Sequence, residues 1–104
     1  MAYVVRITET AEGELEEAYA WIHKRSPLNA ERWRLQLVEK AASLEDFPER
    51  CPLAPENEGA KCELRHLIFG KYRLVFTIIE DTVYVLHIRH GARESIAPED
   101  VELP

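Results

Sequence analysis

The fold is decided by the stretch Tyr72-Arg73-Leu74-Val75-Phe76-Thr77-Ile78-Ile79-Glu80-Asp81-Thr82-Val83-Tyr84-Val85-Leu86-His87-Ile88-Arg89-His90. Two runs rich in β-branched and aromatic residues flank an acidic pair, which is the pattern of an antiparallel hairpin with a short turn. Both runs are too apolar for a ribbon that water surrounds, so another layer must cover at least one face. Cations and histidines gather at the ends of this region: Arg65, His66, Lys71, Arg73, His87, Arg89, His90 and Arg93.

A two-residue turn at Glu80-Asp81 predicts the register of the hairpin. The expected pairs are Ile79–Thr82, Thr77–Tyr84, Val75–Leu86 and Arg73–Ile88. Period-two alternation then divides the side chains between two faces. One face carries Arg73, Tyr84, Leu86, Ile88 and His90, and the other carries Leu74, Phe76, Ile78, Val83, Val85 and His87. The second set is nearly all apolar, so we expect helices to cover it and Arg73 and His90 to point outward. A slip of one residue would exchange the faces.

The first half of the sequence predicts two helices after a short strand at residues 3–7. Thr8 suits the N-cap of a helix from Glu9 to Lys24 or Arg25, and Ser26-Pro27 starts a second helix that ends near Asp46 or Phe47. Each helix has an apolar stripe: Ala11, Leu15, Ala18 and Ile22 in the first, and Ala30, Trp33, Leu37, Ala41 and Leu44 in the second. Leu28, Val38 and Phe47 are expected to widen the second stripe. The short link predicts an antiparallel helical hairpin.

The remaining segments complete an α+β fold. Residues 48–59 hold three prolines and a glycine, which predicts a loop, and residues 60–69 are expected to contain a further strand that turns at Gly70-Lys71. The predicted architecture is an N-terminal strand and an antiparallel helical hairpin packed on a small twisted antiparallel β-sheet. At 104 residues we expect one domain, with an acidic tail at residues 94–104.

Charge is distributed unevenly along the chain. The net charge is −6, yet residues 60–93 carry six Lys or Arg against three acids. An acidic chain is not typical of a general nucleic-acid binder. We expect the acidic tail either to be solvated or to fold back on the basic sheet, where it would mask the surface that a nuclease needs.

Cysteine usage and hydropathy suggest a cytoplasmic protein without a metal or cofactor. Cys51 and Cys62 bracket the proline-rich loop, and without an export signal we expect two thiols rather than a disulfide. Neither a C-x-x-C motif nor a His pair at ligand spacing accompanies them, which argues against zinc. The apolar N-terminal stretch breaks at Arg6, so it is no signal peptide, and no run is long enough for a transmembrane helix.

The order β-α-α-β-β-β, together with several short motifs, resembles the ParE/RelE superfamily of bacterial type II toxins. The motifs that carry the resemblance are Leu44-x-x-x-Pro48, Leu64-Arg65-x-Leu67, Tyr72-Arg73-Leu74-Val75-Phe76 and His90-Gly91-Ala92-Arg93, with Ala11, Leu15 and Ala30 in the helices. No single motif is very specific, but their order and spacing cover nearly the whole chain. The resemblance implies a cognate antitoxin that wraps and neutralises the toxin.

The resemblance offers two activities. RelE-like members cut mRNA in the ribosomal A site, and ParE-like members poison DNA gyrase. Arg73 and Arg93 match two arginines that RelE-like members use in cleavage. The C-terminal tyrosine that often serves as general acid has no match, since Glu99 stands in its place. The paired lysines before the third strand are also missing, with Leu64 and His66 near their positions.

Three functional hypotheses follow from these matches. The favoured one is a gyrase-directed toxin that binds through Arg65, Tyr72, Arg73, Arg89, His90 and Arg93. The second is a ribosome-dependent endoribonuclease in which Arg73, His90 and Arg93 are catalytic. The third is an inactive relative that only binds an antitoxin or forms a homodimer. As plain structural residues, Arg73 and Arg93 would pair with Glu80, Glu94 or Glu99, and His87 would be a satisfied core histidine.

Overall fold

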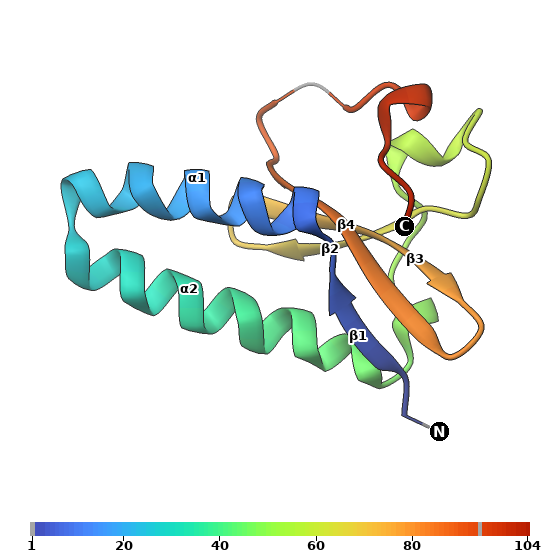
Figure 1. The fold of residues 1–104 in the computed structure, drawn as a ribbon, viewed down its shortest axis with the longest axis horizontal. Helices are drawn as coiled ribbons and strands as arrows, with labels where there is room; N and C mark the ends of the chain where they lie inside the picture. Colours follow the sequence, from blue (N-terminus) through green and yellow to red (C-terminus); the bar gives the residue numbers. More distant parts are fainter. Residues whose placement is uncertain (1, 94) are drawn as a thin grey trace.

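The fold was obtained as a computed structural model, and the structure describes residues 2–93 and 95–104. Two helices, α1 (Glu9–Arg25) and α2 (Pro27–Ala42), stand beside a four-stranded sheet with the order β1-β4-β3-β2 (Figure 1). The strands are β1 (Val4–Ile7), β2 (Arg65–Phe69), β3 (Tyr72–Ile79) and β4 (Thr82–His90). Within the described residues, no helix is both long and apolar enough to cross a membrane.

The helical hairpin forms where the capping signals predict it. The Thr8 side chain accepts a hydrogen bond from the amide of Ala11, which caps α1. Ser26 ends α1 by donating its backbone N–H to the carbonyl of Ile22, and its side chain accepts from Asn29 to cap α2. Pro27 occupies the first turn of α2, where its missing N–H costs nothing. One serine therefore ends one helix and begins the next.

The predicted apolar stripes are confirmed at their centres. Ala11, Ala30 and Leu37 are fully buried, as is Leu44 beyond the end of α2. The widening of the second stripe is wrong, because Leu28, Val38 and Phe47 lie 63%, 45% and 79% exposed. The helix also stops earlier than predicted: α2 ends at Ala42 and a short 3₁₀ turn, Ser43–Glu45, follows.

The sheet is mixed rather than purely antiparallel. β2, β3 and β4 pair antiparallel as predicted, but β1 joins the free side of β4 in the parallel sense, with Val4 opposite Thr82 and Ile7 opposite Val85. Parallel neighbours need a long connection, and the helical hairpin together with β2 and β3 supplies it. The first strand therefore lies beside the last one.

A β-bulge changes the register in the middle of the β3–β4 hairpin. The pairs next to the turn, Ile79–Thr82 and Thr77–Tyr84, are as predicted. Beyond the irregularity at Val75 and Phe76, the predicted pairs Val75–Leu86 and Arg73–Ile88 are wrong. The structure pairs Val75 with His87 and Arg73 with Arg89, because Leu86 is the extra residue that the bulge accommodates.

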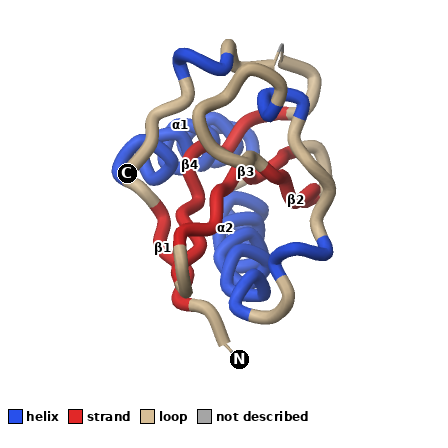
Figure 2. Tube along the Cα trace, turned by 90° about the vertical axis from the view of Figure 1, so that its right-hand side faces the viewer, coloured by secondary structure: helices blue, strands red, loops and turns tan. Residues whose placement is uncertain are grey.

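The bulge also corrects the predicted faces of the sheet. Ile88 packs in the cluster that the helices cover, together with Leu74, Phe76, Val83 and Val85. Leu86 and Tyr84 belong to a second cluster with Val75. This second face is covered by residues 54–62 and by the C-terminal segment, so the sheet is the middle of three layers (Figure 2). The tail therefore folds back on the sheet, which is one of the two expected arrangements.

The start of α1 closes the edge of β4 where β1 ends. The Thr8 amide donates to the carbonyl of Val85 at 3.0 Å, and the Thr8 hydroxyl donates to the same oxygen at 3.1 Å. Two turns later, a carboxylate oxygen of Glu14 accepts from the amide of Ile88 at 3.0 Å. Thr8 and the Glu14 side chain thus make hydrogen bonds to β4 that a longer β1 would have made.

Replacing Thr8 by alanine should therefore destabilise the protein. The change removes the helix cap and the bond to Val85, and loss of a cap costs typically about 1 kcal/mol. We expect the free energy of unfolding in urea to fall by about 1–2 kcal/mol with an unchanged slope. Thr8→Ser keeps the hydroxyl and serves as the control. Equal losses in both variants would contradict this role of the hydroxyl.

Candidate functional site

Arg73 is buried in an ion pair. Arg73 lies on β3 and is 6% exposed, and its guanidinium donates to both carboxylate oxygens of Glu56, which is 1% exposed. The Nη1–Oε1 distance is 3.0 Å. Arg73 therefore does not point outward over an apolar floor as predicted, and its acidic partner is none of the three that the sequence suggested.

A third donor completes the surroundings of this carboxylate. The backbone N–H of Ile96 in the C-terminal segment donates to Oε2 of Glu56 at 2.9 Å. Burial would raise the pKa of Glu56, but the hydrogen bonds from Arg73 and Ile96 outweigh it and hold that pKa below its ordinary value. The pair therefore stays charged at neutral pH and joins three distant parts of the chain.

His66 lies next to the ion pair, on the neighbouring strand β2. Its Nδ1 is 3.5 Å from Nη1 of Arg73. Burial and the nearby guanidinium both lower the pKa of His66. His66 is thus favoured in its neutral form.

A separate cavity collects four of the six predicted binding residues. Tyr72, Arg89, His90 and Arg93 line a hollow of about 540 Å³ at the far end of the hairpin. Its opposite wall comes from α1 and contains Glu14, Glu17, Ala18 and Trp21. The wall of carboxylates faces the wall of cations, so the cavity is not uniformly basic.

Ring contacts hold Tyr72 and His90 in this cavity. Their rings meet edge to face with centroids 5.2 Å apart, and Tyr72 also packs on Trp33 of α2 at 5.1 Å. Nδ1 of His90 accepts from the amide of Ala92 at 3.1 Å, which leaves Nε2 as the protonated nitrogen of the neutral ring. Burial raises the pKa of Tyr72, and the nearby Arg93 partly offsets this. These contacts fix both rings in the lining of the cavity.

Arg65 lies neither in the buried ion pair nor in the cavity lining. Its guanidinium donates to the backbone carbonyls of Cys51 and Glu49, at 2.5 and 3.2 Å, and pairs with Glu63. These contacts hold the proline-rich loop against β2. Arg65 thus has a structural role, and its predicted role in binding stays a prediction. Cys51 and Cys62, at the ends of the same loop, are free thiols.

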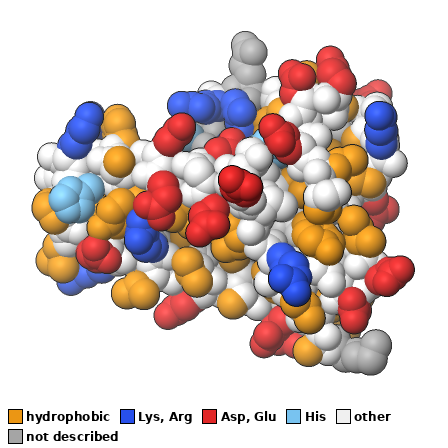
Figure 3. All heavy atoms as spheres, in the orientation of Figure 1, with side chains coloured by type: hydrophobic (Ala, Val, Ile, Leu, Met, Phe, Trp, Pro, Cys, Tyr) orange, Lys and Arg blue, Asp and Glu red, His pale blue; other side chains and the backbone are white. Residues whose placement is uncertain are grey.

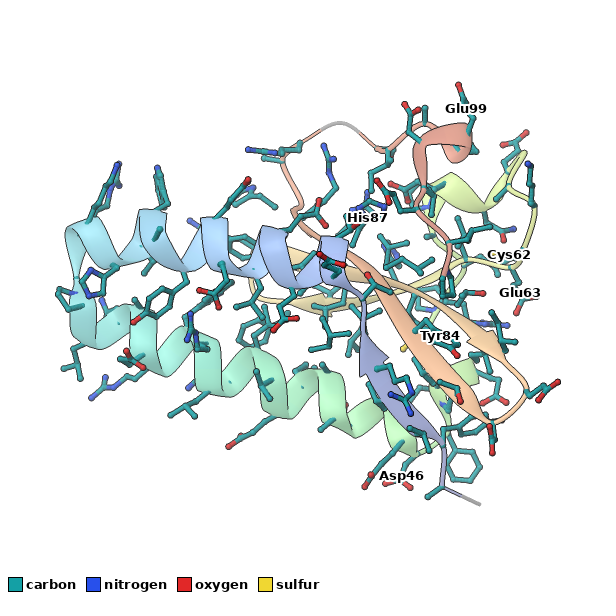
Figure 4. All side chains as sticks on the ribbon, in the orientation of Figure 1. Asp46, Cys62, Glu63, Tyr84, His87 and Glu99 are labelled. Atoms are coloured by element: carbon teal, nitrogen blue, oxygen red, sulfur yellow. The ribbon has the colours of Figure 1, made fainter. Side chains whose placement is uncertain are left out.

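His87 is held between α1 and the C-terminal segment (Figure 4). Its Nδ1 lies 3.1 Å from a carboxylate oxygen of Glu14, and its Nε2 accepts from the amide of Glu102 at 3.2 Å. The residue is 5% exposed. His87 is therefore a core histidine whose two ring nitrogens both have hydrogen-bond partners, as the sequence suggested. It lies beyond the bulge, where the pairing with β3 differs from the predicted one.

Sequence reasoning missed Glu56, Glu14 and Trp21. Glu56 lies in a loop without periodicity, so no local pattern marks it as the partner of Arg73. Glu14 is one of five acids in the first helix, and nothing in the sequence distinguishes the one that faces β4. A usable signal was the deep position of Arg73 in an apolar strand, because a cation there requires a buried acid somewhere in the chain.

The surface in view lacks a broad basic area. On the face in Figure 3, Lys and Arg side chains are separated by acidic and hydrophobic ones. Such interruption weakens the attraction to a phosphate backbone, which depends on several cations acting together.

Comparison with solved structures defines the class of fold. A chain from the chromosomal ParDE toxin–antitoxin system of P. aeruginosa superimposes with a TM-score of 0.70 at 16% identity, covering 86% of this chain and 96% of that one. A chain of the toxin–antitoxin complex RelBE2 from Mycobacterium tuberculosis gives a TM-score of 0.59 at 30% identity, covering 86% and 99%. Both share the arrangement of two helices on a small open sheet.

Sequence comparison gives the family. The protein named Toxin RelE2 of Caulobacter vibrioides is 35% identical over 94 residues, which are 89% of this chain and 99% of that protein. Residues 5–95 match the family model described as the ParE toxin of the type II toxin–antitoxin system parDE. The chain therefore belongs to the ParE toxin family.

Replacing Glu56 by glutamine should test the buried pair. The change leaves the Arg73 charge without its counterion, and breaking a buried pair in this way costs about 3–5 kcal/mol. We expect a drop in the free energy of unfolding of that order at pH 7, measured in urea. Glu58→Gln, at an exposed position two residues away, should change it by less than about 0.5 kcal/mol.

The same pair predicts a pH dependence. Because the pKa of Glu56 is lowered in the folded protein, its contribution is present above the unfolded value of about 4.3 and is lost as the pH falls through the folded value. The difference in unfolding free energy between the natural chain and Glu56→Gln should therefore shrink between pH 6 and pH 3. A constant difference would show that the charge of Glu56 is not what stabilises the fold.

Proposed function

We propose that this chain is the toxin of a type II toxin–antitoxin pair and that it acts by binding and inhibiting DNA gyrase. The observation that carries the choice of target is the state of Arg73. In a nuclease this cation would have to meet the RNA phosphate, but here it is 6% exposed and neutralised by Glu56. A toxin that acts by binding a protein does not require a free guanidinium at this position.

The C-terminal segment supports the same choice. Residues 95–104 contain no tyrosine that could protonate a leaving group, and Glu99 stands at the place that the RelE resemblance assigns to one. The net charge of −6 also opposes approach to ribosomal RNA, whose binding depends on neutralising phosphates. A protein surface imposes no such charge requirement.

A cognate antitoxin is the expected partner. The solved relatives come from toxin–antitoxin systems, one of them as the RelBE2 complex. The helical hairpin offers Leu28 and Leu35 of α2, both more than 60% exposed, for such a contact. The edge strand β2 offers Ile68, which is 54% exposed. A mostly apolar contact should persist at moderate salt. Formation of a homodimer stays a prediction.

The ribosome-dependent nuclease is the second candidate. Two observations favour it: the relative at 35% identity is named Toxin RelE2, and Tyr72, His90 and Arg93 share one cavity. His90 could exchange a proton there, and Arg93 could hold a phosphate. This arrangement would need mRNA to enter the cavity beside α1 and would leave Arg73 unused.

Inducing the chain alone in growing bacteria should distinguish the targets. Under the gyrase proposal we expect filamentous cells and a DNA-damage response while incorporation of labelled amino acids continues. The purified chain should inhibit supercoiling by gyrase at stoichiometric concentrations. A stop of translation within minutes, with mRNA cut inside codons, would reject gyrase in favour of the nuclease.

A folding-deficient variant controls for the burden of expression. Phe76 is fully buried in the main core, so Phe76→Asp places an unpaired charge there and should abolish both phenotypes. Normal growth with the unaltered chain, soluble and folded, would instead support the inactive relative.

A further inference from the structure

The C-terminal strap, which we define as residues 95–104, lies across the sheet face opposite the helices. In Figure 1 it is the red segment that passes beside the yellow-green loop, and Figure 2 shows the same proximity from the side. Val101 packs on the cluster that contains Val75 of β3 and Leu86 of β4. Pro98 lies next to Gly59, where an added Cβ would come within 3.8 Å of its ring.

Among the described residues, few hydrogen bonds join the strap to the rest of the fold. Its backbone is bonded to the rest of the fold at Ile96, which donates to Glu56, and at Glu102, which donates to Nε2 of His87. Ile96 is its buried side chain among the described residues, at 8% exposure. A segment with so little buried apolar area and so few bonds opens at low free-energy cost.

Hollows flank the strap on both sides. One of about 220 Å³ separates it from residues 59–64 of the loop, and one of about 460 Å³ lies between its end and the first turn of α1. Leu103 remains 45% exposed. The strap therefore contacts the sheet at a few side chains and has cavities along both sides.

Beneath the strap lies a ready anion site. Both terminal nitrogens of Arg73 and the N–H of Ile96 converge on the carboxylate of Glu56. A guanidinium binds carboxylate and phosphate oxygens through the same fork of donors. The carboxylate of Glu56 thus occupies the place that the oxygens of a phosphodiester would take.

We propose that the C-terminal strap is an autoinhibitory cover and that Glu56 is an internal substitute for a phosphodiester at Arg73. Detachment of the strap removes the Ile96 donor from Glu56 and exposes the pair to water. A single-stranded nucleic acid then competes with Glu56 for the guanidinium. With the strap in place Arg73 stays closed, which is the state on which the proposed function rests; the proposal concerns the detached state, and its test measures nucleic-acid binding rather than inhibition of gyrase.

The decisive experiment compares the full chain with a chain that ends at Glu94. Binding of a fluorescent ten-nucleotide RNA, and of DNA of the same sequence, is measured by anisotropy at several salt concentrations. We expect at least tenfold tighter binding by the shortened chain. Its salt dependence should steepen by about 0.7 in the slope of log K against log salt, which is the value for one phosphate contact on a single strand. Stronger RNA than DNA binding would identify RNA as the natural source of the phosphodiester, and equal binding would leave the shared backbone as the ligand.

A charge-matched variant separates exposure from simple loss of acids. Truncation removes three acids, so the full chain with Glu99→Gln, Asp100→Asn and Glu102→Gln has the same net charge but keeps the strap. This variant should bind at least threefold more weakly than the shortened chain. Equal affinities would overturn the proposal, because they would show that charge alone is responsible.

Two further variants place the effect at Arg73. In the shortened chain, Glu56→Gln should bind the nucleic acid more tightly than the shortened chain without a substitution. Adding Arg73→Gln to this variant should remove that increase in affinity. A gain that survives the loss of Arg73 would overturn the assignment of the site. Circular dichroism selects the variants that keep the fold.

A point variant tests the strap in the intact chain. Glu102→Pro removes the N–H that His87 accepts, and the extended backbone of Val101 suits a following proline. Glu102→Gln keeps the N–H and is the control. Hydrogen exchange of residues 95–104 should become at least tenfold faster in Glu102→Pro alone, while β3 stays protected. Unchanged exchange in Glu102→Pro would mean that His87 does not hold the strap.

Discussion

The buried ion pair between Arg73 and Glu56 is the constraint on which the second half of the fold depends. A guanidinium in the middle of an apolar sheet is tolerated only when its charge and its donors are satisfied. Glu56 satisfies it from the proline-rich loop, and Ile96 bonds to the same carboxylate from the C-terminal segment. One charge on β3 therefore determines where two segments without regular structure must lie, and these segments form the third layer of the protein.

Much of the architecture could be predicted from the sequence because its signals are local. Thr8 and Ser26 mark helix ends through bonds to residues three or four positions away, and the stripe from Ala30 to Leu44 follows from helical periodicity alone. The turn at Glu80-Asp81 likewise predicts the pairs on its own side of the bulge, Ile79–Thr82 and Thr77–Tyr84. Such features need no knowledge of the rest of the chain, which is why the α+β fold and the family pattern were accessible.

The parts that failed depend on contacts between distant residues. A bulge at Leu86 shifts every pair beyond it by one residue, so an alternation that holds at Val83 is reversed at Ile88. Arg73 stays on its predicted face and is buried because the loop acid Glu56 and the C-terminal segment cover that face, and no pattern in the loop indicates that partner. The predicted site residues were thus divided, with Tyr72 and its neighbours around a cavity and Arg73 inside the fold.

The bonds from the start of α1 to the edge of β4 have a geometric consequence. Thr8 and Glu14 are six residues apart, about 9 Å along a helix, and they bond to Val85 and Ile88, which stand on either side of the bulged residue Leu86. The bulge makes these three steps of β4 cover only the two steps from Phe76 to Leu74 on β3, so it sets the spacing that the helix must match. One residue inserted between Thr8 and Glu14 would turn the helix by about 100° and bring Glu14 out of step with Ile88. The length of these first two turns is therefore fixed by the strand beside them.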